Sequence, residues 1–187
     1  PAPATPAQQP AAPPKIKTNV AGLNDLFSRY LNEPQPEDAK MIKDNLKEVK
    51  NLIAEVRKLG PSLAQPQGIL GRIGGLFGVT GQSILENQLN AMEGNIDTGL
   101  EATTHEELMP AVENLRETIN KLHNGILLVA KQVYPTNSPE DQRNIAGIRS
   151  AFMNLSIPEL TDIFRTSGGD LKTTLDALAA KGKQFIR

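Results

Sequence analysis

The sequence predicts an all-α fold, an antiparallel helical bundle with coiled-coil-like seams followed by a smaller C-terminal helical subdomain. Apolar residues recur at spacings of three and four, and no segment alternates with the period of two that a strand requires. Leu and Ile outnumber Val and the aromatic residues, a bias that favours helices. We expect residues 1–18 to form a Pro/Ala-rich arm or linker, 19–134 the bundle, and 135–187 the subdomain.

The chain begins with an uncharged, low-complexity stretch of Pro, Ala and Gln, PAPATPAQQPAAPP over residues 1–14. Such a segment cannot bury enough apolar surface to fold by itself. We expect a flexible tether, and the alternative is an arm that becomes ordered on a neighbouring subunit.

Two helices are expected next, over 22–32 and over 36–59. The first ends before Pro34, and the second opens on an acidic first turn and ends at Gly60-Pro61. The apolar face of the second helix steps by four and three residues through Ile42, Leu46, Val49, Ile53 and Val56.

A basic arc lies beside that apolar face, since residues follow one another about 100° apart on a helical wheel. It contains Lys40, Lys43, Lys47, Lys50 and Arg57. Acidic residues fill the next arc, which is typical of the solvated flanks of a coiled-coil helix. The alternative is a stripe that binds phosphates or anionic lipid.

A third helix over about 83–100 and a fourth that ends at Val133 complete an expected three-helix core. The spacings Thr103/Glu106 and Thr104/Glu107 both fit a capping box at the start of the fourth helix. Its seam alternates steps of three and four through Val112, Leu115, Ile119, Leu122, Ile126, Val129 and Val133. Such a seam can close within one chain or between chains, so self-association is an open option.

Three helices are expected after Pro135, each opened by a capping residue. Ser138 and Ser156 are each followed by Pro and acidic residues in the first turn, and Asp170 precedes the last helix, 171–184.

Residues 68–81 form a Gly-rich apolar segment in which Arg72 is the sole charge. In a helix its glycines would form overlapping GxxxG pairs that allow another backbone to approach closely. The candidate interaction residues are Gly71, Ile73, Gly74, Gly75, Leu76, Phe77 and Gly78. We expect a helix or loop packed within the bundle. A hinge is one alternative. The stretch 75–78 is also similar to the glycine-ridged fusion peptides of viral envelope proteins, which implies membrane insertion.

Little in the sequence points to catalysis. The chain has no Cys and 2 His, which excludes thiolate nucleophiles and disulfides and leaves little room for a metal site. His105 lacks the second His of an HExxH motif, and phosphate-loop motifs are absent. We expect His105 in a solvated turn and His123 at the surface or rim. Paired acids lie at expected helix starts, where the dipole explains them. We therefore predict no catalytic, cofactor-binding or metal-binding residues and no enzyme activity.

The expected function is that of a non-catalytic structural or adaptor subunit of a larger assembly, and a phage or viral virion component fits the pattern. Partners would be proteins or further copies of this chain. Membrane association through residues 68–81 is the first alternative and nucleic-acid packaging the second. The net charge of −1 makes nucleic acid the weaker partner. The sequence shows neither a signal peptide nor a run of about 20 apolar residues, so we expect a soluble protein of unassigned location.

Overall fold

The computed structural model describes residues 18–64 and 81–186. It confirms the all-α prediction: the described residues form helices and no strand, apart from one isolated bridge between Asn19 and Ser156. The helices are α1 (Val20–Asn32), α2 (Pro36–Val56), α3 (Gly60–Ala64), α5 (Gly81–Glu101), α6 (His105–Val133), α7 (Pro139–Asn154), α8 (Ile157–Thr166) and α9 (Leu171–Gly182), with 3₁₀ turns η1 (Arg57–Leu59) and η2 (Lys183–Phe185).

Polar side chains cap the helix starts as expected. Ser138, Ser156 and Asp170 each accept a hydrogen bond from a backbone N–H of the first turn. At α8 the capping box is complete, because the Glu159 carboxylate also accepts from the Ser156 N–H. At α6 it is not. The Thr104 hydroxyl accepts from the Glu107 N–H. The Glu107 carboxylate, however, accepts from the N–H of Thr103, the residue before the N-cap, and not from that of Thr104 itself.

The predicted C-terminal end of the second helix, at residue 59, is wrong. The α-helix ends at Val56, tightens into η1, and is followed by α3 across Gly60 and Pro61. Pro61 is tolerated because it lies in the first turn of α3, where a backbone N–H has no helical acceptor. Leu59 and Leu63 are both buried, so packing continues through a point that the local sequence marks as a stop.

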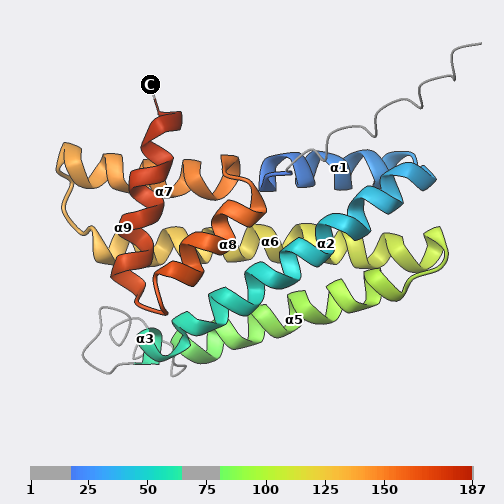
Figure 1. Ribbon diagram of the computed structural model, residues 1–187, viewed down its shortest axis with the longest axis horizontal. Coiled ribbons are helices and arrows are strands. Elements are labelled where there is room, and N and C mark those ends of the chain that lie inside the picture. Colours follow the sequence, from blue (N-terminus) through green and yellow to red (C-terminus); the bar gives the residue numbers. More distant parts are fainter. Residues whose placement is uncertain (1–17, 65–80, 187) are drawn as a thin grey trace, which may run out of the picture.

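Figure 1 shows α2, α5 and α6 running the length of the molecule, with the chain reversing direction between α2 and α5 and again between α5 and α6. Helix α5 packs against both α2 and α6, α8 lies on α2, and α7 contacts α6 and crosses α9. These contacts are consistent with the expected bundle. Buried residues on both sides of the expected domain boundary at 134 belong to one hydrophobic cluster.

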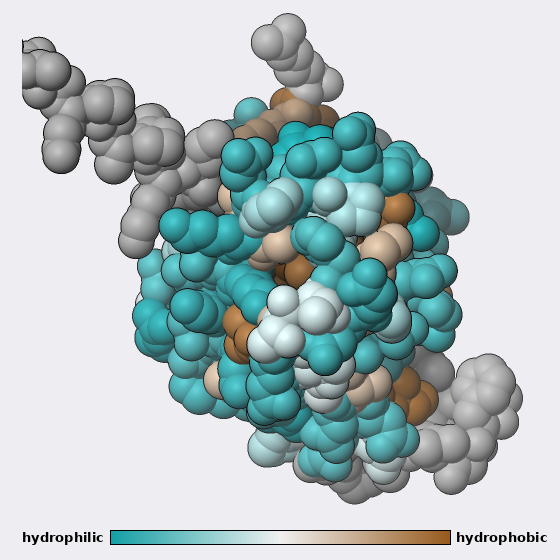
Figure 2. Space-filling model, turned by 90° about the vertical axis from the view of Figure 1, so that its right-hand side faces the viewer, coloured by the Kyte–Doolittle hydropathy of each residue, from teal (hydrophilic) through white to brown (hydrophobic). Residues whose placement is uncertain are grey.

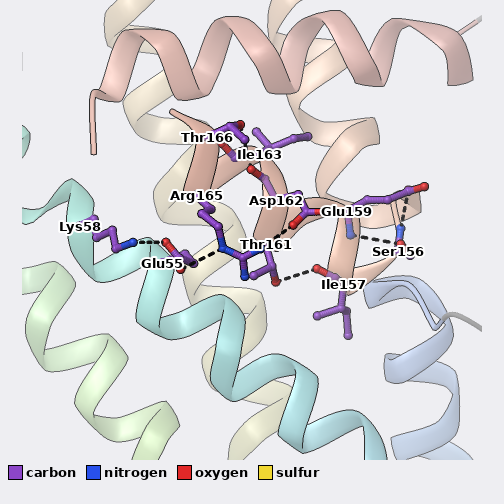
Figure 3. Close-up of polar contacts among 10 residues, drawn as sticks. All are labelled: Glu55, Lys58, Ser156, Ile157, Glu159, Thr161, Asp162, Ile163, Arg165 and Thr166. Atoms are coloured by element: carbon purple, nitrogen blue, oxygen red, sulfur yellow. Dashed lines mark hydrogen bonds and ion pairs between the residues drawn. The ribbon is translucent and has the colours of Figure 1, made fainter. Parts of the chain in front are cut away.

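Polar contacts fasten α8 to α2 (Figure 3). The Glu55 carboxylate forms ion pairs with Lys58 of the following 3₁₀ turn, at 2.5 Å, and with Arg165 of α8, at 3.4 Å. Hydrogen bonding to Lys58 and then to Arg165 lowers the pKa of Glu55. Arg165 also pairs with Asp162 one turn earlier. Leu160 and Phe164 on the same helix are buried.

Helices α7 and α9 cross so closely that glycine is required on both. A methyl group added at Gly182 would overlap the carbonyl group of Gly147, and one added at Gly147 would lie 2.6 Å from the Ala179 carbonyl oxygen. Neither glycine has a positive φ, so the requirement comes from space and not from backbone conformation.

Candidate functional site

An apolar groove opens where α3, α5, α6 and α9 come together, at the end of the bundle where α3 lies in Figure 1. Its volume is about 410 Å³, within the range of pockets that hold small ligands or partner side chains. It is lined by Val56, Leu59, Leu63, Ile84, Leu85, Gln88, Leu122, Gly125, Ile126, Leu128, Val129, Phe164, Leu171, Thr174, Leu175 and Leu178.

The groove offers almost no polar group to a ligand. Among the residues that the structure describes, no charged residue lines it, and the polar side chains in its lining are Gln88 and Thr174. The Thr174 hydroxyl already donates to the Asp170 carbonyl oxygen at 2.7 Å. Recognition in this groove would therefore rest on shape and on the burial of apolar surface.

The predicted seam of α6 divides at Gly125. Before it the seam is closed within the chain, since Val112, Leu115, Ile119 and Leu122 are at most 4% exposed. After it the seam lies at the surface of the cluster: Ile126, Val129 and Val133 are partly buried.

Leu128 projects beside this second part of the seam and is 60% exposed, the largest exposure among the large hydrophobic residues that the structure describes. A methyl group at Gly125 would meet only the Gln88 side chain, at 3.8 Å, so this turn of α6 is loosely covered. The sequence did not single out Leu128, because it lies just off the seam and its exposure depends on the neighbouring helices.

The basic arc of α2 also divides. Lys50 forms an ion pair with Asp97 at 2.7 Å, and Arg57 forms one with Glu93 at 2.5 Å. Hydrogen bonding to Asp97 raises the pKa of Lys50. This half of the arc faces carboxylates of α5 and joins the two helices.

The other half, Lys40, Lys43 and Lys47, lines a second cavity of about 480 Å³ at the opposite end of the bundle. The remaining lining residues are Tyr30, Pro36, Ala39, Asp44, Ala102, Thr103, Thr104, His105 and Leu108. Figure 2 views the molecule from this end and shows a largely hydrophilic face with small hydrophobic spots.

His105 does not lie in a simply solvated turn, as expected from the sequence. It is half-buried, and its Nδ1 lies 2.6 Å from the hydroxyl oxygen of Tyr30. Tyr30 is on α1, far from His105 in the sequence. Burial and then the Glu106 charge raise the pKa of Tyr30, so the phenol keeps its proton. No local pattern could have revealed this pair, because it is formed by the packing of α1 beside the start of α6.

His123 lies at the rim, half-buried, and its ring stacks on Phe152 with centroids 4.8 Å apart. Within residues 18–64 and 81–186, no group of His, Asp and Glu could hold a metal ion. The paired acids that the sequence placed at helix starts do lie in first turns, at Glu37/Asp38, Glu106/Glu107 and Glu140/Asp141. Asp38 has an additional role, a bidentate pair with Arg29.

The Gly-rich candidates Gly71, Ile73, Gly74, Gly75, Leu76, Phe77 and Gly78 lie outside the described residues. None of the helices in the described part of the chain combines the length and apolar character needed to cross a membrane. Comparison of the chain with protein families, curated proteins and solved structures gave no match.

Proposed function

We propose that this chain is a non-catalytic structural or adaptor subunit that assembles with a second copy of itself through the apolar groove. The observation that carries the proposal is the divided seam of α6. The seam residues before Gly125 are at most 4% exposed, whereas Ile126 and Val129 after it line an open groove whose wall also includes the exposed Leu128. A seam with its apolar residues only partly covered is the form expected of a helix that also packs between chains.

The shape of the patch favours a second copy as the occupant. Leu128, which is 60% exposed, lies on the wall of the groove, so an exposed apolar side chain and a hollow share one surface. A two-fold axis through such a patch places the exposed side chain of each copy in the hollow of the other, which is the self-complementary arrangement of a symmetric dimer. The described lining residues carry no charge, so these residues of the two copies do not repel one another.

The strength of the contact can be estimated from Leu128. Full burial of a leucine side chain contributes about 1.5–3 kcal/mol. Because Leu128 is 60% exposed, covering it contributes about 1–2 kcal/mol in each copy, and a symmetric dimer contains it twice. Replacing Leu128 with Gln should therefore weaken the dimer by at least about tenfold.

The test is the molar mass of the full chain by light scattering over a dilution series. We expect a mass that rises with concentration toward that of a dimer or a multiple of it. The variant Leu128→Gln should shift the association to higher concentration. Met41→Gln is the matched control, because Met41 is 38% exposed on α2 and does not line the groove. A monomer at every concentration, or equal effects of the two substitutions, would contradict the proposal.

The more specific interpretations remain predictions. A virion component would be one setting for such a subunit. Membrane association rests on residues 68–81, and a nucleic-acid role rests on a basic arc of which Lys50 and Arg57 face carboxylates of α5.

A further inference from the structure

The lysine-lined cavity at the end of the bundle away from the groove has no part in the proposed assembly. Lys40, Lys43 and Lys47 lie on successive turns of α2 and form one wall. The facing wall is the short connection between α5 and α6 together with Tyr30 of α1. Residues from three separate parts of the sequence thus meet around one hollow.

Two of the three lysines have no carboxylate partner within residues 18–64 and 81–186. Lys40 and Lys47 are exposed and form no ion pair with any residue that the structure describes. Lys43 is fixed in place, because its ammonium donates to the Ala102 carbonyl oxygen just after the end of α5. The wall therefore combines one anchored cation with two that are free to reach a ligand.

The facing wall adds neutral hydrogen-bond donors. The Thr104 hydroxyl oxygen accepts from the Glu107 N–H, so its own proton remains available to a ligand. When the Tyr30 hydroxyl donates to Nδ1 of His105, the ring proton is on Nε2 and that N–H is also a donor.

Acidic groups near the cavity reduce its positive charge, and Glu106 is one of them, since its charge adds to burial in raising the pKa of Tyr30. Among the lining residues that the structure describes, Asp44 is the one carboxylate, against three lysines. Glu107, in the first turn of α6, is already engaged: its carboxylate accepts from the N–H and hydroxyl of Thr103. The hydrogen bonds from Thr103, followed by one from the Thr104 backbone, are the main causes that lower the pKa of Glu107, and the charge of Lys43 is the smallest.

We propose that this cavity binds a phosphate group, with Lys40 and Lys47 as its principal charge partners and His105 at its edge. Lysine ammonium groups bind phosphate as mobile point charges. A volume of about 480 Å³ suits a small phosphorylated ligand. The same chemistry is offered by a free polyphosphate and by the phosphate of a lipid headgroup, so the experiment includes both.

The first arm titrates the full chain with inorganic pyrophosphate at low salt and follows it by calorimetry and by histidine NMR. The chain has 2 His, so the ring signals of His105 and His123 serve as a local probe and an internal reference. We expect saturable binding that weakens as salt is added, with a shift of the His105 signal and none of His123.

The variant is Lys40→Gln with Lys47→Gln, and the control is Lys121→Gln with Lys131→Gln on α6. Each double variant removes two positive charges from exposed positions, so we expect the circular dichroism spectrum of each to match that of the wild type. We expect at least a tenfold loss of affinity in the first and little change in the control. Equal losses in both, or a shift of both histidine signals, would overturn the proposal because the binding would then be diffuse.

The second arm measures co-sedimentation with vesicles that contain phosphatidic acid against neutral vesicles. Binding that requires the phosphatidic acid and is lost with Lys40→Gln/Lys47→Gln supports the site and assigns its phosphate to a headgroup. Saturable pyrophosphate binding without vesicle binding supports it and assigns a free phosphate. Failure of both probes to bind the wild-type chain would refute the site.

Discussion

Replacing Gly182 with Ala tests the close crossing of α7 and α9. The added methyl carbon would overlap the backbone carbonyl group of Gly147 and approach the Ala151 nitrogen to 2.9 Å. Gly182 has a φ of −72°, which Ala adopts without strain. The whole cost therefore comes from forcing α7 and α9 apart.

The size of that cost follows from what the crossing buries. Ile148, Ala151, Leu178 and Ala179 lie on these two helices and are at most 2% exposed. Overpacking usually costs about 1–3 kcal/mol, and a backbone obstacle cannot move aside as a side chain can. The higher helix propensity of Ala returns at most about 1 kcal/mol. A cost at the upper end of that range, about 3 kcal/mol, less about 1 kcal/mol of helix propensity, leaves a net loss of about 2 kcal/mol, which lowers Tm by roughly 4–8 °C in a chain of this size.

The matched control is Gly94→Ala. Gly94 is exposed within α5, and a methyl group there would meet nothing within 4 Å. The same substitution should therefore stabilise the chain by about 0.5–1 kcal/mol. Thermal and urea unfolding followed by circular dichroism measure both variants. A Gly182→Ala variant as stable as the wild type would refute the steric argument, as would a Gly94→Ala variant that loses stability.

The remaining predictions concern a histidine, a cap and a turn. Burial and then the charge of Arg149 lower the pKa of His123 below its ordinary 6.5, so the unfolded chain takes up a proton first and stability falls as the pH drops below that value. His123→Phe should flatten this dependence in urea unfolding at about pH 5.5 and about pH 7.5, and unchanged slopes would count against it. Ser156→Ala should cost about 1 kcal/mol through loss of the α8 cap, and an unaltered urea midpoint would show the cap to be dispensable. Gly169→Ala should lower Tm more than Gly168→Ala, because both have positive φ but only Gly169 packs against the backbone of η1; the reverse order would contradict the close approach.

Much of the fold was predictable because the signals are local. The apolar face of α2 through Ile42, Leu46 and Val56 is buried as expected, and the Ser138 and Ser156 caps act as expected. Such patterns depend only on helical periodicity and on the unpaired N–H groups of the first turn.

The candidate sites were less predictable because they depend on tertiary packing. The sequence placed Lys40 and Lys50 in one arc, and only the position of α5 reveals that Lys50 meets Asp97 while Lys40 lines a cavity. In the same way, the heptad-like spacing places Leu122 on the seam of α6 and Leu128 just off it, but it does not tell how far Leu128 is covered. Its exposure of 60% depends on the neighbouring helices.

The central claim, that Leu128 of one copy enters the groove of another, can be tested by disulfide cross-linking. The chain has no Cys, so every disulfide that forms must involve the introduced cysteines. One copy would carry Leu128→Cys and a second, tagged copy Gln88→Cys, since Gln88 lines the groove. A disulfide requires the two Cβ atoms to come within about 4 Å. We predict a mixed disulfide dimer on mild oxidation, in clear excess over the pair Met41→Cys with Gln88→Cys. Equal yields from the two pairs would contradict the claim.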